Sequence, residues 1–271
     1  MKGKPGLSKD KSKTESKNGR GDASRPLPTE AADSAVSPGQ EPLRDASVVV
    51  AEAAHELRLP IANIKLLVET LLDGALEDKE VCRRMLKRAY SEVDRLQALV
   101  ADLLSLEQVA KRRDDLNCEW LSLKERAVYA IETVAKNTSE KNIQVCLDIA
   151  DDHFIYANKG QLDQVILNLL ENAVKFTPLG GKITIRSGEK PGSFCIEDNG
   201  IGMPASEIPK IFSKFYRIDK SISKGGTGLG LSIVKQVLDL HGAKITVKSQ
   251  EGVGSCFELD FPSPKSGGRL L

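Results

Sequence analysis

The chain has 271 residues, with 39 Lys and Arg side chains and 38 Asp and Glu side chains. Because these charges nearly cancel, composition gives no support for a protein held by charge on nucleic acid or on a membrane surface. The length suits a short helical module followed by one globular domain. No run approaches the ~20 apolar residues of a membrane-spanning helix, so we expect no membrane span and no nucleic-acid partner.

The five cysteines are scattered singly along the chain, without the close spacing of metal ligands or redox pairs. Unpaired thiols of this kind suit a reducing compartment, so the sequence predicts a cytoplasmic protein with free cysteines. The five are Cys82, Cys118, Cys146, Cys195 and Cys256.

Residues 1–44 are rich in Lys, Ser, Gly, Pro and Glu and contain almost no large apolar side chains. Such a segment buries too little surface to offset the entropy of ordering, so we predict a disordered N-terminal arm. An organelle transit peptide is the weaker alternative, because Asp10, Glu15 and Asp22 are unusual in such acid-poor segments.

Residues 45–111 carry two apolar heptad patterns separated by a break at 73–78, which predicts a helical hairpin. One hairpin cannot cover both apolar stripes, so we expect two copies to form a four-helix bundle. The alternative is a hairpin folded back on the next domain. The first seam comprises Ala54, Leu57, Ile61, Ile64, Val68 and Leu71, and the second comprises Cys82, Leu86, Ala89, Val93, Leu96, Val100 and Leu103.

Residues 112–118 are charged and without apolar periodicity, which predicts a hinge. The following segment, 119–262, mixes helical patterns at 123–134 and 159–176 with five segments of strand character. Because helices and strands do not alternate regularly, we predict an α+β two-layer sandwich, with helices on one face of a mixed sheet. Residues 263–271 form a flexible tail in this prediction. The predicted strands are 144–149, 182–186, 193–197, 244–249 and 255–261.

His55 directly follows Ala54 of the first seam, about 100° around the helix from the apolar stripe, so we expect it to be accessible. Glu56 beside it supplies a carboxylate that accepts a ring proton, which would free the other nitrogen for attack on a phosphoryl group. Pro60 in a helix interior costs about 3 kcal/mol, and such locally unfavourable residues mark functional sites. The alternative is a structural histidine beside a solvated acid.

Asn168 and Asn172 lie four residues apart, on one face of a predicted helix with apolar neighbours. An amide oxygen is a suitable ligand for Mg²⁺ beside phosphates, whereas the alternative is a pair of surface amides. Asp198 ends a predicted strand and is followed by Gly200 and Gly202, which permit close backbone approach. Residues 225–234 form a glycine-rich loop that enters an apolar helix, where amides bind phosphate oxygens.

In this order, the four segments closely resemble the H, N, G1 and G2 boxes of two-component sensor histidine kinases. Residues 211–217 resemble the F box of that family, and residues 252–257 resemble its last glycine motif. The resemblance covers roughly 46–262. It implies a dimerisation and histidine-phosphotransfer hairpin, followed by a catalytic domain of the Bergerat ATP-binding type.

The resemblance implies that ATP phosphorylates His55 with the help of Glu56, and that the phosphoryl group then passes to an Asp of a response regulator receiver domain. Asn172 would bind Mg²⁺, and Asp198 would contact adenine. Residues 204–227 would form a mobile lid. The residues expected to bind the nucleotide are Asn168, Asn172, Lys175, Phe176, Asp198, Gly200, Gly202, Gly226, Thr227, Gly228, Leu229 and Gly230.

The sequence departs from the family pattern at Leu59, where relatives carry a Thr or Asn that positions water for dephosphorylating the partner. An apolar side chain holds no water, so we expect weak phosphatase activity. The lid is short, with Ile222 where relatives often have Arg, and Lys220 or Lys224 as the compensating cation. The family normally has sensor and membrane segments before the hairpin, so we expect input from a partner protein or an incomplete chain. The alternative functions are a non-kinase ATPase clamp of the same superfamily and a pseudokinase scaffold.

Overall fold

The structure, a computed structural model, describes residues 41–111, 116–218 and 226–264. Most of the predicted disordered arm and of the C-terminal tail therefore lies outside the described residues. Helix α1 begins at Glu41, four residues before the predicted start of the hairpin. Its second residue is Pro42, which the first turn of a helix accommodates because the proline needs no hydrogen-bonded amide there.

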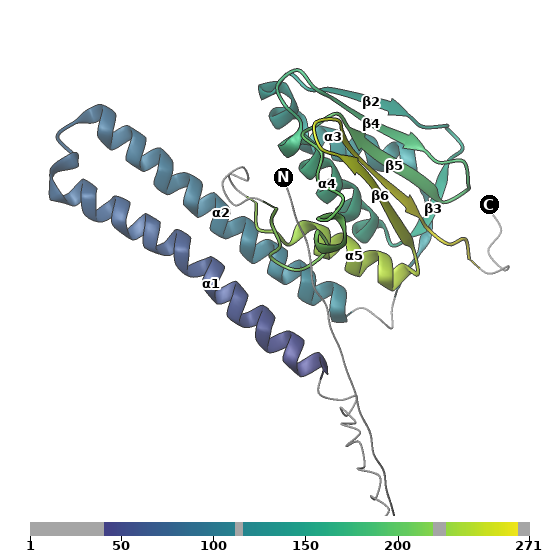
Figure 1. Cartoon of the computed structure of the whole chain (residues 1–271), viewed down its shortest axis with the longest axis horizontal. Coiled ribbons are helices and arrows are strands. Elements are labelled where there is room, and N and C mark those ends of the chain that lie inside the picture. Colours follow the sequence, from purple (N-terminus) through teal and green to yellow (C-terminus); the bar gives the residue numbers. More distant parts are fainter. Residues whose placement is uncertain (1–40, 112–115, 219–225, 265–271) are drawn as a thin grey trace, which may run out of the picture. The chain divides into compact units, whose positions relative to one another are not determined.

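The predicted helical hairpin is confirmed. Helix α1 (Glu41–Thr70) ends in a single π-helical turn, η1 (Leu71–Ala75), and α2 (Lys79–Lys111) returns beside it (Figure 1). Gly74 has a φ of 121°, a conformation that favours glycine at the turn. Asp78 caps α2, since its Oδ1 accepts hydrogen bonds from the backbone N–H groups of Glu80 and Val81 at 2.9 and 3.1 Å.

The apolar positions of α1 divide differently from the predicted seam. Ala53, Pro60 and Leu71 are buried, while Ile61 and Val68 are more than 40% exposed. The reason is geometric, because one partner helix covers only the side of α1 that faces it. The predicted seam therefore includes residues that a single chain leaves in contact with water.

The catalytic domain contains two sheets. Strands β1 (Glu119–Ser122) and β3 (Phe154–Ala157) form a small antiparallel pair. The five-stranded sheet has the order β2-β4-β5-β7-β6, with β2 parallel to β4 and the other pairs antiparallel. Its strands are β2 (Gln144–Asp148), β4 (Lys182–Ser187), β5 (Ser193–Asp198), β6 (Lys244–Gln250) and β7 (Gly254–Asp260).

Helices α3 (Leu123–Glu140), α4 (Lys159–Phe176) and α5 (Gly230–His241) lie on one side of this sheet (Figure 1), which confirms the predicted α+β two-layer sandwich. A short 3-10 turn, η2 (Ile208–Lys210), follows β5. The side chains between the two layers, including Leu169 of α4 and Ile196 of β5, are fully or almost fully buried. Burial of this apolar surface is the main force that holds the layers together.

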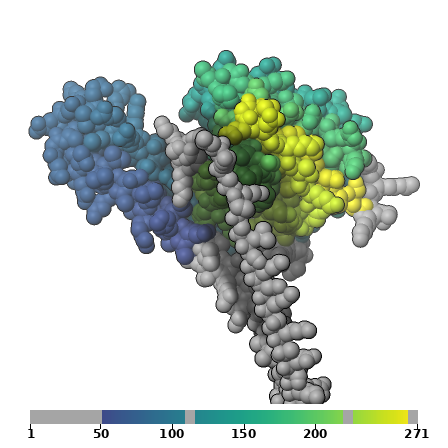
Figure 2. All heavy atoms as spheres, viewed as in Figure 1, coloured from purple at the N-terminus to yellow at the C-terminus, as the bar shows by residue number. Residues whose placement is uncertain are grey.

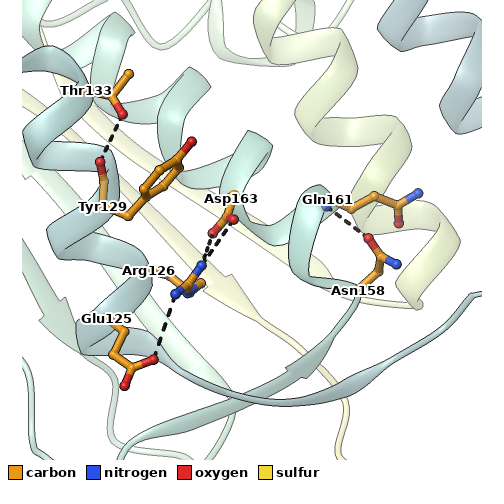
Figure 3. Close-up of polar contacts among 7 residues, drawn as sticks. All are labelled: Glu125, Arg126, Tyr129, Thr133, Asn158, Gln161 and Asp163. Carbon is orange, nitrogen blue, oxygen red and sulfur yellow. Dashed lines mark hydrogen bonds and ion pairs between the residues drawn. The ribbon is translucent and has the colours of Figure 1, made fainter.

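Polar contacts fix α4, the helix that carries the two predicted asparagines. Asn158 caps its first turn by accepting a hydrogen bond from the Gln161 amide at 3.2 Å (Figure 3). Arg126 of α3 forms an ion pair with Asp163 of α4, with 3.3 Å between Nη1 and Oδ2 (Figure 3). Both side chains are less than 20% exposed, so this pair is screened less than a surface pair.

The C-terminal half of α2 packs on the catalytic domain. Leu99 and Leu106 of α2 belong to the same core cluster as the α5 side chains, and the Gln236 amide donates to the Leu106 carbonyl at 3.4 Å. In its C-terminal half, α2 therefore packs on the next domain, as the alternative of a folded-back hairpin predicts. Among the described residues, no helix combines the length and apolar character that crossing a membrane requires.

Candidate functional site

The glycine-rich loop and α4 approach each other closely enough to exclude side chains between them. A Cβ atom at Gly230 would lie 3.1 Å from Oδ1 of Asn168, and one at Gly226 would lie 2.1 Å from Nζ of Lys175. Glycine at both positions allows the loop to approach these two polar side chains closely. The structure therefore brings together the second and fourth of the predicted segments.

Asn168 has an unsatisfied donor at this place. Its Nδ2 is buried and has no hydrogen-bond partner among the described residues. Buried polar groups without partners are rare, and this one therefore indicates a ligand with an acceptor atom. Asn172 lies one helical turn further along α4 and is half-buried. The pair therefore suits an oxygen-rich ligand and its metal ion better than it suits plain solvent.

Lys175 places a positive charge beside the glycine-rich loop. Partial burial lowers the pKa of its ammonium group, and the positive charges of Arg217 and Arg95 lower this pKa further. The Nζ atom also lies 5.1 Å from the ring centroid of Phe176. An anionic ligand would offset this crowding of positive charge and favour the protonated amine.

Asp198 is a buried carboxylate at the end of β5, with 8% of its surface exposed. Its Oδ1 accepts the Gly200 amide at 2.8 Å, and the Ser255 backbone also hydrogen-bonds to it. Burial raises the pKa of Asp198 despite these two bonds. The carboxylate is thus held in one orientation, in a place where it would accept a hydrogen bond from a ligand amino group.

Two glycines of the predicted boxes allow backbone segments to touch. Gly202 has a φ of 62°, and a Cβ there would lie 1.9 Å from the Gln250 carbonyl oxygen. Gly228 has a φ of 77°, and its Cβ would lie 2.8 Å from the backbone of Phe215. Larger residues would strain the backbone and collide at both positions.

The end of the glycine-rich loop leads directly into α5. Leu229 is fully buried and anchors the loop, while Thr227 Oγ1 accepts the Leu229 amide at 3.2 Å. Among the described residues, no side chain caps the N-terminus of α5 at Leu229. The first N–H groups of α5 therefore need other partners, and an anion satisfies them.

His55 is exposed on α1, as predicted, although Ala54 of the predicted seam is exposed as well and Ala53 is buried instead. Glu56 Oε2 lies 3.3 Å from Nη2 of Arg95 on α2, and both side chains are about one fifth exposed. The carboxylate is therefore oriented across the hairpin by Arg95. Sequence reasoning on Glu56 did not foresee this arginine, which stands 39 positions away.

Two further residues at the site have no sequence signal. Lys141 donates from Nζ to the carbonyl oxygens of Val174, Lys175 and Thr177 at 2.7, 2.7 and 3.0 Å, and so fixes the end of α4. Asp102 of α2 accepts a short hydrogen bond from Thr227. Both contacts join residues distant in sequence. The lid residues 219–225, including Lys220, Ile222 and Lys224, lie outside the described residues.

Two family models match the chain. Residues 46–111 match the His Kinase A (phospho-acceptor) domain. Residues 157–265 match the histidine kinase-, DNA gyrase B- and HSP90-like ATPase family. The first match contains His55, and the second contains the α4, β5 and α5 residues described above.

Similar proteins agree with both matches. The chain is 33% identical to sensor histidine kinase WalK of Bacillus subtilis, over 79% of this chain and 36% of that protein. It is also 33% identical to sensor-like histidine kinase SenX3 of Mycolicibacterium smegmatis, over 80% of this chain and 58% of that protein. The chain thus spans only part of the length of these curated relatives.

Solved structures share the fold. Acinetobacter baumannii histidine kinase AdeS matches 78% of this chain and 98% of its own, with a TM-score of 0.62 and 24% identity. Histidine kinase ThkA, solved in complex with response regulator protein TrrA, matches 82% of this chain and 63% of its own, with a TM-score of 0.60 and 25% identity. With both of its domains matched in order, the chain belongs to the two-component sensor histidine kinase family.

Proposed function

We propose that the chain is an ATP-dependent protein-histidine kinase that phosphorylates its own His55 and transfers the phosphoryl group to an Asp of a response regulator receiver domain. The observation that carries this proposal is the buried Nδ2 of Asn168, which lies on the same helix as Lys175 and has no hydrogen-bond partner among the described residues. The phosphates of ATP supply the acceptors and the negative charge that this place lacks.

The residues present fit a nucleotide with a magnesium ion. Asp198 is buried and its Oδ1 accepts the Gly200 amide, and its carboxylate would accept a hydrogen bond from the amino group of adenine. The unsatisfied donor of Asn168 and the ammonium of Lys175 would face the phosphates, and the Asn172 amide oxygen would hold Mg²⁺. When bound, the ion would offset charge on the transferring phosphoryl group. Phe176, Gly200, Gly202 and residues 226–230 would line the nucleotide.

His55 would act as the nucleophile. A bond forms between its ring nitrogen and the γ-phosphorus while the bond to the bridging oxygen breaks, and ADP leaves. Glu56 would take the proton from the other ring nitrogen or orient the ring. Arg95 holds the Glu56 carboxylate in place from α2. The exposure of His55 leaves it accessible first to ATP and then to the receiver domain.

Positive charge continues from the nucleotide site toward the hairpin. Burial lowers the pKa of Arg217, the charge of Arg95 lowers it further, and the charge of Glu56 raises it. Arg217 therefore lies within electrostatic reach of both the α4 site and the residue next to His55. Such a cluster would stabilise a phosphoryl group in passage between the two regions.

The hairpin would dimerise through its exposed apolar face. Ile61, Val68 and Leu86 are all more than 40% exposed, and Tyr90 is 70% exposed. Leu76, Leu86 and Tyr90 also line a groove near the turn of the hairpin. A second copy of the hairpin would cover these side chains in a four-helix bundle. We propose domain limits of 45–111 for this hairpin, 112–118 for the hinge and 119–262 for the catalytic domain.

Leu59 is 54% exposed and lies one helical turn after His55. It offers no hydrogen bond to a water molecule that would attack the phosphorylated receiver. The phosphatase activity is therefore expected to be weak, and Leu59→Thr is expected to raise it at least severalfold. The rate of loss of label from purified phosphorylated receiver, with either variant in excess, measures this. Rapid dephosphorylation by the unchanged chain would rule the expectation out.

The alternatives have less support. An ATPase clamp would not need the exposed His55 on a helical hairpin. A pseudokinase scaffold would not need an intact set of nucleotide-binding residues. The chain has both. We further propose a cytoplasmic location, which the free cysteines support.

The proposal is tested by incubating the chain with Mg²⁺ and ATP labelled at the γ-phosphate. The unchanged chain should acquire an acid-labile label, and His55→Gln should acquire none. His153→Gln is the matched control and should keep the label, because His153 lies in the catalytic domain away from the predicted boxes. Unlabelled wild type, or a label that persists in His55→Gln, would contradict the proposal.

A further inference from the structure

The open face of the five-stranded sheet carries a cluster that the proposed kinase reaction does not use. Along β5, Phe194, Ile196 and Asp198 point toward the helices, and the strand's alternation puts Cys195 and Glu197 on the opposite face, where Cys195 is 4% exposed. β7 alternates in the same way and places Cys256 on that open face. Figure 2 shows atoms of β6 and β7, in yellow, at the molecular surface.

The strand register brings together cysteines that the sequence presents as isolated. In the antiparallel pairing of β5 with β7, Glu197 stands opposite Cys256, and Cys195 is two positions from Glu197 on the same face. The two Sγ atoms and a carboxylate oxygen of Glu197 all lie within 4.8 Å of one another. Sixty residues of sequence separate the two thiols, so no spacing motif predicts the cluster.

These distances suit a thiophilic cation. A tetrahedral zinc ion with Zn–S bonds of about 2.3 Å holds its sulfur ligands about 3.8 Å apart, which small side-chain rotations here would reach. Two thiolates and a carboxylate form a three-ligand set that leaves one coordination position for water. All three ligands come from adjacent strands of a rigid sheet, which limits the cost of ordering them.

Arg186 of β4 currently supplies the positive charge at this place. Its Nε lies 2.9 Å from Cys195 Sγ, and its Nη2 lies 3.4 Å from Glu197 and 4.0 Å from Cys256. One guanidinium therefore contacts all three prospective ligands. Its side chain is 45% exposed, so it is free to turn into solvent when another cation takes its place.

We propose that Cys195, Cys256 and Glu197 form a binding site for a thiophilic divalent cation of the zinc class. Binding would release the thiol protons to solvent and displace Arg186 from its contacts. The site lies on the face of the sheet opposite the α4 residues, and the inference does not depend on the proposed kinase activity. Because Asp198 and Ser255 directly adjoin two of the ligands, the cation would link the two strands that hold the Asp198 carboxylate.

The test uses Co²⁺ as a spectroscopic probe and Zn²⁺ as its competitor, with two complementary variants of the whole chain. Cys82, Cys118 and Cys146 become Ser in the first, and Cys195 and Cys256 become Ser in the second. The first variant should bind one Co²⁺ per chain with visible bands of tetrahedral thiolate coordination, which Zn²⁺ should abolish. The second should show no such bands. Equal spectra for the two variants, or no bands in the first, would overturn the proposal.

A single substitution at an exposed residue tests the proposal even if a variant with several substitutions fails to fold. Glu197→Gln should weaken Co²⁺ binding at least tenfold in the otherwise unchanged chain, whereas Glu189→Gln, an exposed change outside the cluster, should leave it unchanged. Zinc should also raise the melting temperature of the unchanged chain in proportion to its binding. Identical cation affinity in both glutamine variants would show that the Co²⁺ binds elsewhere and would refute the assignment.

Discussion

The hairpin and the catalytic domain bury apolar surface in different ways. In the catalytic domain, three helices cover one face of a sheet, and the large side chains with less than 2% exposure all belong to it. In the hairpin, by contrast, Leu66, Leu72 and Tyr90 remain more than 60% exposed. The catalytic domain therefore holds its core within one chain, whereas the hairpin leaves part of its apolar surface exposed, which the proposed second copy would cover.

The largest effect is expected in the core of the catalytic domain. Leu170→Ala should lower the free energy of unfolding by about 2–5 kcal/mol, because it leaves a cavity in a close-packed layer. Leu179→Ala, at a position that is 77% exposed, is the control and should cost less than about 0.5 kcal/mol. Urea denaturation of both variants measures the difference. Equal costs would mean that α4 is not part of a continuous core.

The next effect concerns the glycines at which two backbone segments approach each other closely. Gly202→Ala should destabilise the catalytic domain and weaken nucleotide binding, because its Cβ would overlap the Gln250 carbonyl. Gly252→Ala is matched, since Gly252 also has a positive φ but has nothing within 4 Å of its Cβ. The control should cost only the backbone strain of about 1–2 kcal/mol. Thermal denaturation measures the stability of both variants, and titration with a fluorescent ATP analogue measures their nucleotide binding. Similar losses in Gly202→Ala and Gly252→Ala would show that the close approach of Gly202 to Gln250 does not matter.

A smaller effect is expected at the apolar face of the hairpin. Leu86→Asp should weaken dimerisation at least tenfold, because the new charge would have to be buried against the second copy. Ser91→Asp adds the same charge at another exposed position of α2 and should leave the dimer intact. Sedimentation across a concentration series measures both variants. A monomeric unchanged chain, or no response to Leu86→Asp, would contradict a dimer formed through this face.

The smallest effect is the contribution of Asp198 to the pH dependence of stability. Burial raises its folded-state pKa above the usual value of 3.8, so the folded state binds the proton more tightly than the unfolded state. The contribution of Asp198 to stability is therefore greatest below the unfolded pKa and is lost as the pH rises through the folded pKa. Asp198→Asn should remove this contribution from the slope of unfolding free energy against pH. An unchanged slope would assign it to other groups.

Local patterns in the sequence were sufficient to predict the main elements and to propose the residues of the site. Heptad spacing predicts both helices of the hairpin, and alternation predicts the five strands of the large sheet. β1 and β3 escape prediction because four residues are too few to show a period. The contacts of Lys141 and Arg95, and the proximity of Cys195 to Cys256, also escape it. These depend on strand register and helix packing, which no local pattern encodes.

The central claim is that the nucleotide site and the phosphorylated histidine are separate parts of one reaction. It is tested most directly by measuring ATP-analogue binding and γ-phosphate labelling together in His55→Gln and Asp198→Asn. We predict that His55→Gln binds the analogue like the unchanged chain and takes up no label. Asp198→Asn should bind at least tenfold more weakly and take up little or none. A label in His55→Gln, or loss of nucleotide binding in that variant, would contradict the account.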